Sequence, residues 1–247
     1  MKSLLCAIGA ALIALSTIVG SADASVVIAG TRVVFPAANG EVTVRLSNDG
    51  NQPALVEAWI DAGDPNSTPD SAKVPFLITP PLVRMNAGKG QSLRIVYTGQ
   101  PLPTDRESLF WLNVLEIPPK PSAKQGEEQN TLQFAVRSRL KLFFRPAQLV
   151  GESNTAAQQV TWKVVADGAG YALEAHNPTP YHITFSKLSL SVEGSVYAPD
   201  NGMVAPLSSL RLPVKKLARA PAAGTVVEYT TINDFGAAAS FKGAISP

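Results

Sequence analysis

Apolar and polar residues alternate with a period of two along much of this chain. In Glu41–Asn48 (EVTVRLSN), every second residue from Val42 to Leu46 is apolar, and the residues between them are polar. Ser92–Tyr97 (SLRIVY) alternates in the same way. No segment of the mature chain shows a long helical period. This pattern is typical of β-strands that bury one face.

Further strands are predicted wherever apolar and β-branched residues gather between turn residues. They are Ser25–Phe35, Leu55–Ile60, Phe76–Thr79, Leu109–Ile117 and Leu132–Phe144, then Val160–Val165, Tyr171–Asn177, Ile183–Val192, Leu210–Val214 and Thr225–Thr231. The 20 prolines and 18 glycines, spread without a period, favour many short elements. We expect an all-β fold of two antiparallel sandwiches, with Trp59, Trp111 and Trp162 in their cores.

The chain length is sufficient for two such domains. With 247 residues, it has room for two domains of about 100–120 residues each. A strand pattern ends at Pro146, and a new series of strands follows Glu152. We therefore expect an N-terminal domain at residues 25–147 and a C-terminal domain at residues 150–247.

Residues 1–24 have the features of a secretory signal peptide. Lys2 supplies the positive start, Leu4–Val19 is almost entirely apolar, and Ala22-Asp23-Ala24 has the small-x-small form of a cleavage site. We expect cleavage after Ala24 and export of the mature chain to an oxidising compartment. No second hydrophobic stretch follows, so we expect no membrane insertion of the mature chain.

Composition excludes several classes of function. The only cysteine, Cys6, lies in the signal segment, so the mature chain has no thiol for catalysis, zinc or disulfides. A formal net charge of +2 gives no nucleic-acid footprint. His176 and His182 are the only histidines, and no nucleophile elbow or phosphate loop is present, so we expect no cofactor and no enzyme.

The longest strand pattern, Leu132–Phe144, has an unusual position. Leu132, Phe134 and Val136 start an apolar row that Leu140 and Leu142 continue. The strand directly follows a polar loop at 118–130, so its first half can stand clear of the core. One interpretation is an ordinary half-buried strand. The other is an exposed strand that adds to the sheet of a second protein.

Four stretches in order resemble the periplasmic pilus-assembly chaperones. They are LPTDRESLFWLNVLEIP at 102–118, LQFAVRSRLKLFFRP at 132–146, NPTPYHITFSKL at 177–188 and TINDFG at 231–236. The resemblance covers essentially the whole mature chain. It implies two immunoglobulin-like sandwiches in a boomerang arrangement, the architecture associated with donor-strand complementation.

The resemblance also implies roles for individual residues. Arg32 and Lys141 match the family's pair of cations that anchor the C-terminal carboxylate of a pilus subunit. Two cations suit the two oxygens of a free carboxylate. The hydrophobic residues that the donor strand would supply are Leu132, Phe134 and Val136. A charge network between the two domains would consist of Glu107, Arg145 and Asp234.

The partners that the resemblance implies are pilus or fimbrial subunits and an outer-membrane usher. Self-association through the donor strand is a further interaction that the pattern allows. The modest loop at 118–130 lacks cysteines and favours the family's short-loop branch. The alternatives are a pilus structural subunit or adhesin, and a secreted enzyme on a β-sandwich. The missing mature cysteines and the doubled domain argue against a subunit.

Overall fold

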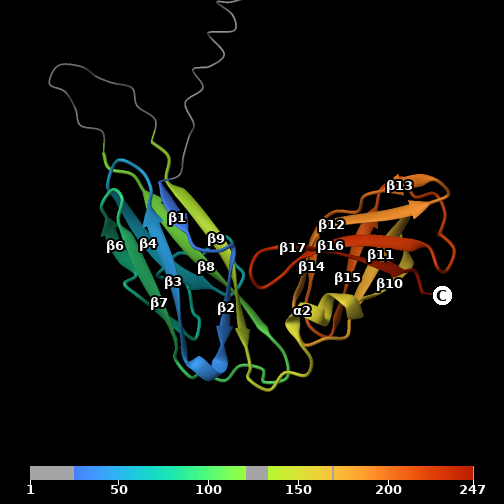
Figure 1. Ribbon diagram of the computed structural model, residues 1–247, viewed down its shortest axis with the longest axis horizontal. Coiled ribbons are helices and arrows are strands. Elements are labelled where there is room, and N and C mark those ends of the chain that lie inside the picture. The colour runs from blue at the N-terminus through green and yellow to red at the C-terminus, as the bar shows by residue number, and fades with distance from the viewer. Residues whose placement is uncertain (1–24, 121–132, 169, 247) are drawn as a thin grey trace, which may run out of the picture.

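The computed structural model describes residues 25–120, 133–168 and 170–246, and these form two β-sandwiches (Figure 1). The first sandwich packs a four-stranded sheet against a five-stranded sheet. The four-stranded sheet has the order β1 (Val26–Ile28), β3 (Glu41–Asn48), β7 (Gly90–Tyr97), β5 (Phe76–Thr79). The five-stranded sheet has the order β2 (Arg32–Pro36), β9 (Val136–Arg145), β8 (Ser108–Ile117), β4 (Ala54–Asp61), β6 (Leu82–Met85). A 3₁₀ turn, η1 (Ala37–Asn39), follows β2.

Alternating residues from the two sheets fill the core of the first sandwich. Val44 and Leu46 of β3 face Leu112 and Leu142 of the opposite sheet, as the period-two pattern predicts. An aromatic cluster of Phe35, Phe76, Phe110 and Phe144 lies in this core, and the ring centroids of Phe35 and Phe76 are 5.4 Å apart. This packing fixes the inward face of β8 and β9, the two strands that carry most of the site.

The segment predicted as one strand, Ser25–Phe35, is two strands in different sheets. β1 pairs antiparallel with β3, whereas β2 pairs parallel with β9. The change of sheet occurs at Gly30, whose φ of 97° lies in a region that favours glycine. The apolar pattern predicted extended chain correctly but could not show the bend, because both pieces bury residues in the same core.

The second sandwich has a three-stranded and a five-stranded sheet. The first has the order β10 (Thr161–Asp167), β11 (Gly170–Asn177), β15 (Ser208–Val214). The second has the order β13 (Ser195–Tyr197), β12 (Ile183–Val192), β16 (Val226–Ile232), β17 (Ala238–Ala244), and β14 (Gly202–Val204) also pairs with β12. Trp162, Phe185 and Tyr229 form its aromatic centre. The short helices α2 (Ser153–Ala156) and η2 (Ala157–Gln159) precede β10.

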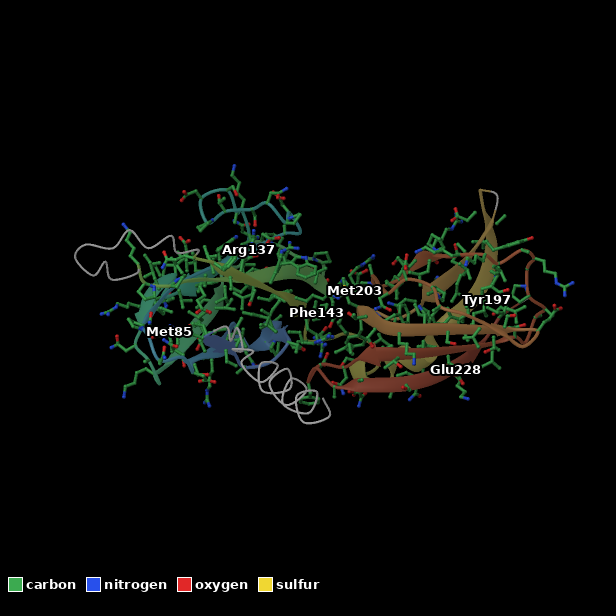
Figure 2. All side chains as sticks on the ribbon, turned by 90° about the horizontal axis from the view of Figure 1, so that it is seen from above. Met85, Arg137, Phe143, Tyr197, Met203 and Glu228 are labelled. Atoms are coloured by element: carbon green, nitrogen blue, oxygen red, sulfur yellow. The ribbon has the colours of Figure 1, made fainter. Side chains whose placement is uncertain are left out.

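The two sandwiches approach each other at one end and diverge at the other, like a boomerang (Figure 1). The chain crosses from β9 to α2 at the closed end, and the turn between β16 and β17 reaches toward β2. Figure 2 places Phe143, near the end of β9, where the domains meet, with Arg137 farther out on the same strand.

Two details of the sequence interpretation were wrong. Trp111 and Trp59 are not in the main core, because they have the opposite parity to the inward residues of β8 and β4. Trp59 is buried under neighbouring side chains, and Trp111 is half-buried. The strands β6, β13, β14 and β17 were not predicted, because they are short or, for β17 (AASFKGA), rich in small residues.

Candidate functional site

Strand β9 has an unpaired edge along its first half. β8 pairs with it from Val136 to Phe144, but β2 pairs only with Lys141–Arg145 on the other side. Within the ranges that the structure describes, no strand occupies the second side of residues 136–140. The backbone N–H and C=O groups there are free to receive another strand.

The apolar row on β9 changes from exposed to buried along the strand. The exposed fraction is 69% for Phe134, 41% for Val136 and 8% for Leu140. The predicted donor residue Leu132 lies outside the described residues. The strand begins at Val136, four residues later than predicted, because Pro118 and Pro119 follow β8 and have no N–H to extend the ladder.

Arg32 and Lys141 lie side by side where this unpaired edge ends. They are register partners across the parallel pair of β2 and β9. Arg32 Nη1 donates to the carbonyl of Ile232 at 2.9 Å, and Lys141 Nζ donates to Thr184 Oγ1 at 3.0 Å. Both bonds reach the second domain. Neither cation has a carboxylate within 4.0 Å among residues 25–120, 133–168 and 170–246.

The electrostatics of this pair favour an anion. Burial, with the neighbouring Arg32 charge, lowers the pKa of Lys141 to about 8. Burial also lowers the pKa of Arg32, an effect that the charge of Asp234 opposes. Arg32 Nε is buried and has no hydrogen-bond partner among the described atoms. Two adjacent, partly desolvated cations with spare donors are the arrangement that a carboxylate would stabilise.

The predicted charge network joins the two domains at the closed end. Arg145 Nε donates to Glu107 Oε1 at 2.8 Å. Its Nη1 and Nη2 donate to the two oxygens of Asp234 at 2.7 and 3.0 Å. Ser153 Oγ also donates to Asp234 at 2.8 Å. The resemblance implied this trio, and in the structure Arg145 contacts both Glu107 and Asp234.

The pKa directions agree with this geometry. Burial opposes the charge of Arg145, but hydrogen bonds and charges from Asp234 and Glu107 outweigh it and raise the pKa of Arg145. Burial also opposes the charge of Asp234, but its hydrogen bonds from Arg145 and Ser153 and nearby positive charges hold its pKa below the usual range. Both groups therefore stay ionised at neutral pH.

His182 extends this network, a role that sequence reasoning missed. Its backbone N–H donates to Glu107 Oε2 at 2.8 Å, and its ring lies 5.3 Å from that of Phe143. Tyr181 packs its ring against the Arg145 guanidinium at 5.2 Å. Asn177 shapes the preceding turn by donating to the Tyr181 carbonyl. The only signal in the sequence was the place of these residues in the NPTPYHITFSKL segment.

A second network, also missed, covers the outer face of β9. Asp61, whose side chain is 2% exposed, accepts from Arg139 Nη2 at 2.6 Å and from Asn113 Nδ2 at 2.7 Å. Arg137 donates to Asn113 Oδ1 at 2.7 Å and lies over the Trp59 ring at 4.7 Å. Burial opposes the charge of Asp61, but the bonds from Arg139 and Asn113 lower its pKa. The network therefore holds β9 against β8 and β4 along its unpaired half.

The part of the chain that the structure describes shows neither a metal-binding cluster nor a membrane-spanning helix. No group of three or more His, Cys, Asp or Glu side chains in that part of the chain could hold a metal ion. None of its helices has the length and apolar character to cross a membrane. At the junction, a small pocket of about 40 Å³ lies among residues that include Arg32, Phe143 and Thr184.

Comparison with known proteins identifies relatives over both domains. Residues 25–150 match the family described as "Pili and flagellar-assembly chaperone, PapD N-terminal domain", and residues 155–242 match "Pili assembly chaperone PapD, C-terminal domain". The chain is 46% identical over 244 residues to the chaperone protein FimB/FhaD of Bordetella pertussis, covering 97% of this chain and 95% of that protein.

Solved structures give the same result. The crystal structure of the YadV chaperone superposes with a TM-score of 0.76 at 39% identity, covering 90% of this chain and 100% of that one. The SafB chaperone of Salmonella enterica, solved in complex with the SafA pilin, gives a TM-score of 0.71 at 29% identity, with 92% and 99% covered.

Proposed function

This chain belongs to the PapD family of pilus-assembly chaperones. We therefore propose that the free edge of β9 and the Arg32–Lys141 pair both bind a fimbrial subunit. The protein is a periplasmic chaperone of the chaperone–usher pathway, and it is not an enzyme. The observation that carries the proposal is the unpaired edge, which ends at two adjacent cations without a carboxylate partner among the described residues.

The cation pair is the anchor for the C-terminal carboxylate of the subunit. Among the described residues, Arg32 has a buried Nε without a partner, and Lys141 Nζ makes one hydrogen bond, to Thr184. A carboxylate between them accepts charge-assisted hydrogen bonds from both. Since side chains alternate along a strand, fixing the last residue also fixes which side chains of the subunit strand face the chaperone.

The free edge supplies the rest of the interaction. The last strand of the subunit pairs with residues 136–140, and Leu132, Phe134 and Val136 fill the groove where the subunit sheet is incomplete. Full burial of an apolar side chain stabilises by about 1.5–3 kcal/mol. Of Phe134 and Val136, Phe134 has the larger exposed fraction. We therefore expect Phe134 to bury the most apolar surface in the subunit groove.

The remaining residues set the shape of the binding surface. The contacts of Arg145 with Asp234 and of Glu107 with His182 hold the second domain against the first. Thr184 and Ile232 therefore stay beside the cation pair. We assign residues 1–24 to the signal peptide, 25–147 to the donor domain and 150–247 to the second domain.

The partners follow from this arrangement. They are pilin or adhesin subunits, as in the chaperone–pilin complex of SafB with SafA, and an outer-membrane usher that receives the subunit. Self-association through the same edge protects β9 when no subunit is bound. Placement in the short-loop branch depends mainly on residues 121–132, which lie outside the described part of the chain. The alternative of a pilus subunit is set aside because both halves match chaperone domains.

Co-expression with a fimbrial subunit in the periplasm tests the proposal. Lys141→Ala removes half of the anchor, whereas Lys163→Ala changes an exposed lysine on β10 of the second domain. We expect the subunit to disappear from the Lys141→Ala preparation and to co-purify normally with the Lys163→Ala protein. Circular dichroism should show both variants folded. A normal subunit yield with folded Lys141→Ala protein would contradict the proposal.

A further inference from the structure

Glu116 occupies an unusual position near the last residue of β8, at the end of the first sandwich that lies away from the second domain. It continues the inward-facing row of β8, after Phe110, Leu112 and Val114, which are all buried in the core. A carboxylate on this face must find a partner or stay hydrated. No Lys, Arg or His side chain in the described ranges lies within 4.0 Å of it.

The partners of Glu116 are the first two residues that the structure describes. Its Oε2 accepts from the Val26 N–H at 3.1 Å, and its Oε1 accepts from the Ser25 N–H at 3.3 Å and from the Ser25 hydroxyl. These bonds cross from one sheet to the other, because β1 belongs to the four-stranded sheet and β8 to the five-stranded sheet.

Ser25 is seated closely at this point. Its carbonyl accepts from the Asp49 N–H at 2.7 Å. A Cβ at Gly50 would lie 2.5 Å from the Ser25 Cβ, so the backbone at position 50 approaches Ser25 more closely than any other residue type allows. The chain is therefore held on three sides at the residue that follows Ala22-Asp23-Ala24.

We propose that Glu116 is a built receptor for the α-ammonium group that removal of the signal peptide creates on Ser25. Hydrolysis of the Ala24–Ser25 peptide bond by a signal peptidase consumes one water molecule. It leaves a carboxylate on Ala24 and an amine on Ser25. An α-amino group has an ordinary pKa of about 7.7–8.0, so it is mostly protonated at neutral pH.

Processing thus turns the amide N–H that donates to the Glu116 carboxylate into an ammonium group, which forms an ion pair with it. The positive charge adds a Coulomb attraction to Glu116 that the amide N–H lacks. The new pair joins the two sheets beside Val136, the register partner of Glu116 and the first residue of the unpaired edge of β9. β1 and β9 start at this same end of the domain (Figure 1). The two sheets of the first domain are therefore held together more strongly in the mature chain than in the precursor. This happens at the end of the domain where the unpaired edge of β9 begins.

The experiment compares defined N-termini in two backgrounds. One chain starts at Ser25, and the second has two added alanines before Ser25. Each is made with Glu116 and with Glu116→Gln, and thermal unfolding of the first domain is followed for all four. We expect the Ser25 chain to unfold about 2–4 °C higher than the extended chain, and we expect Glu116→Gln to abolish that difference.

Intact mass of the protein exported to the periplasm supplies the second readout. The expected first residue is Ser25, and any other first residue would overturn the proposal. Equal midpoints for the Ser25 and extended chains would also overturn it. A difference that persists in the Glu116→Gln background would show that another group receives the ammonium, with the same consequence. None of these readouts depends on subunit binding.

Discussion

Subunit binding should weaken as the pH rises above about 8, because Lys141 must be charged to hold a carboxylate. In the free protein, burial and the charge of Arg32 lower the pKa of Lys141 to about 8. A bound carboxylate favours the charged form and raises that pKa again. Binding above pH 8 therefore takes up a proton, so the affinity is highest below pH 8 and falls as the pH rises.

The size of the effect follows from the same values. If the carboxylate restores the ordinary value of 10.5, the window from about 8 to 10.5 spans about 2.5 pH units. The affinity then falls by about tenfold between pH 7 and pH 9, and by a few hundredfold at most. The stability of the free protein should change in the opposite direction. A lysine with a lowered folded-state pKa costs stability at neutral pH, and this cost decreases as the pH rises through the window.

Calorimetric titration with a synthetic peptide can measure this. The peptide carries the C-terminal strand of a co-purified subunit, once as the free acid and once as the C-terminal amide. The amide has no carboxylate, so it should bind weakly and without the pH dependence. Lys141→Arg is the matched protein control, because arginine keeps its charge throughout this range. It should bind the free acid with an affinity that is nearly constant from pH 7 to pH 9.5.

Two results would refute this reasoning. The first is an unchanged affinity of the unmutated protein for the free acid between pH 7 and pH 9.5. The second is an equal decrease for the protein with Lys141→Arg, which would assign the titration to another group. Either result would remove Lys141 from the anchor.

Three further predictions concern the networks and the donor edge. Asp234→Ala leaves the partly buried Arg145 guanidinium with one carboxylate partner, and it should lower the free energy of unfolding by about 2–3 kcal/mol and separate the calorimetric transitions of the two domains. Glu228→Ala, which removes an exposed ion pair, should leave that free energy nearly unchanged. Asp61→Ala should lower the free energy of unfolding, measured in urea, by about 3–5 kcal/mol, because it leaves buried donors unpaired. A decrease below about 1 kcal/mol would mean that this network does not stabilise β9. Phe134→Ala should leave the midpoint of unfolding nearly unchanged and reduce subunit co-purification at least tenfold, whereas Leu142→Ala should destabilise by about 2–5 kcal/mol.

Much of the fold was predictable because its determinants are local. Period-two alternation predicted β3 and β7, and turn residues separated most of the other strands. The alternation identifies which side chains share a face, but it does not identify the neighbour of that face. Trp59 and Trp111 therefore looked like core residues, although they lie on the outer face of their sheet under Arg137 and Arg139.

The site residues came from the resemblance rather than from the pattern. Arg32 and Lys141 are 109 positions apart, and nothing in their local sequence distinguishes them from other charges on strands. The parallel register of β2 and β9 makes them neighbours, and a register is fixed by the packing of both strands in one core. The same reason explains why Asp61, Asn113 and His182 were missed.

The sequence by itself determined the strand alternation, the two cores, and the cationic and apolar residues available on β9. It did so because burial selects side chains one position at a time. Only the tertiary structure decided that β2 begins beside Lys141 and leaves residues 136–140 without a partner on one side. Strand pairing is a relation between distant segments, so the place where a ladder ends depends on the length of the partner strand and not on the edge itself.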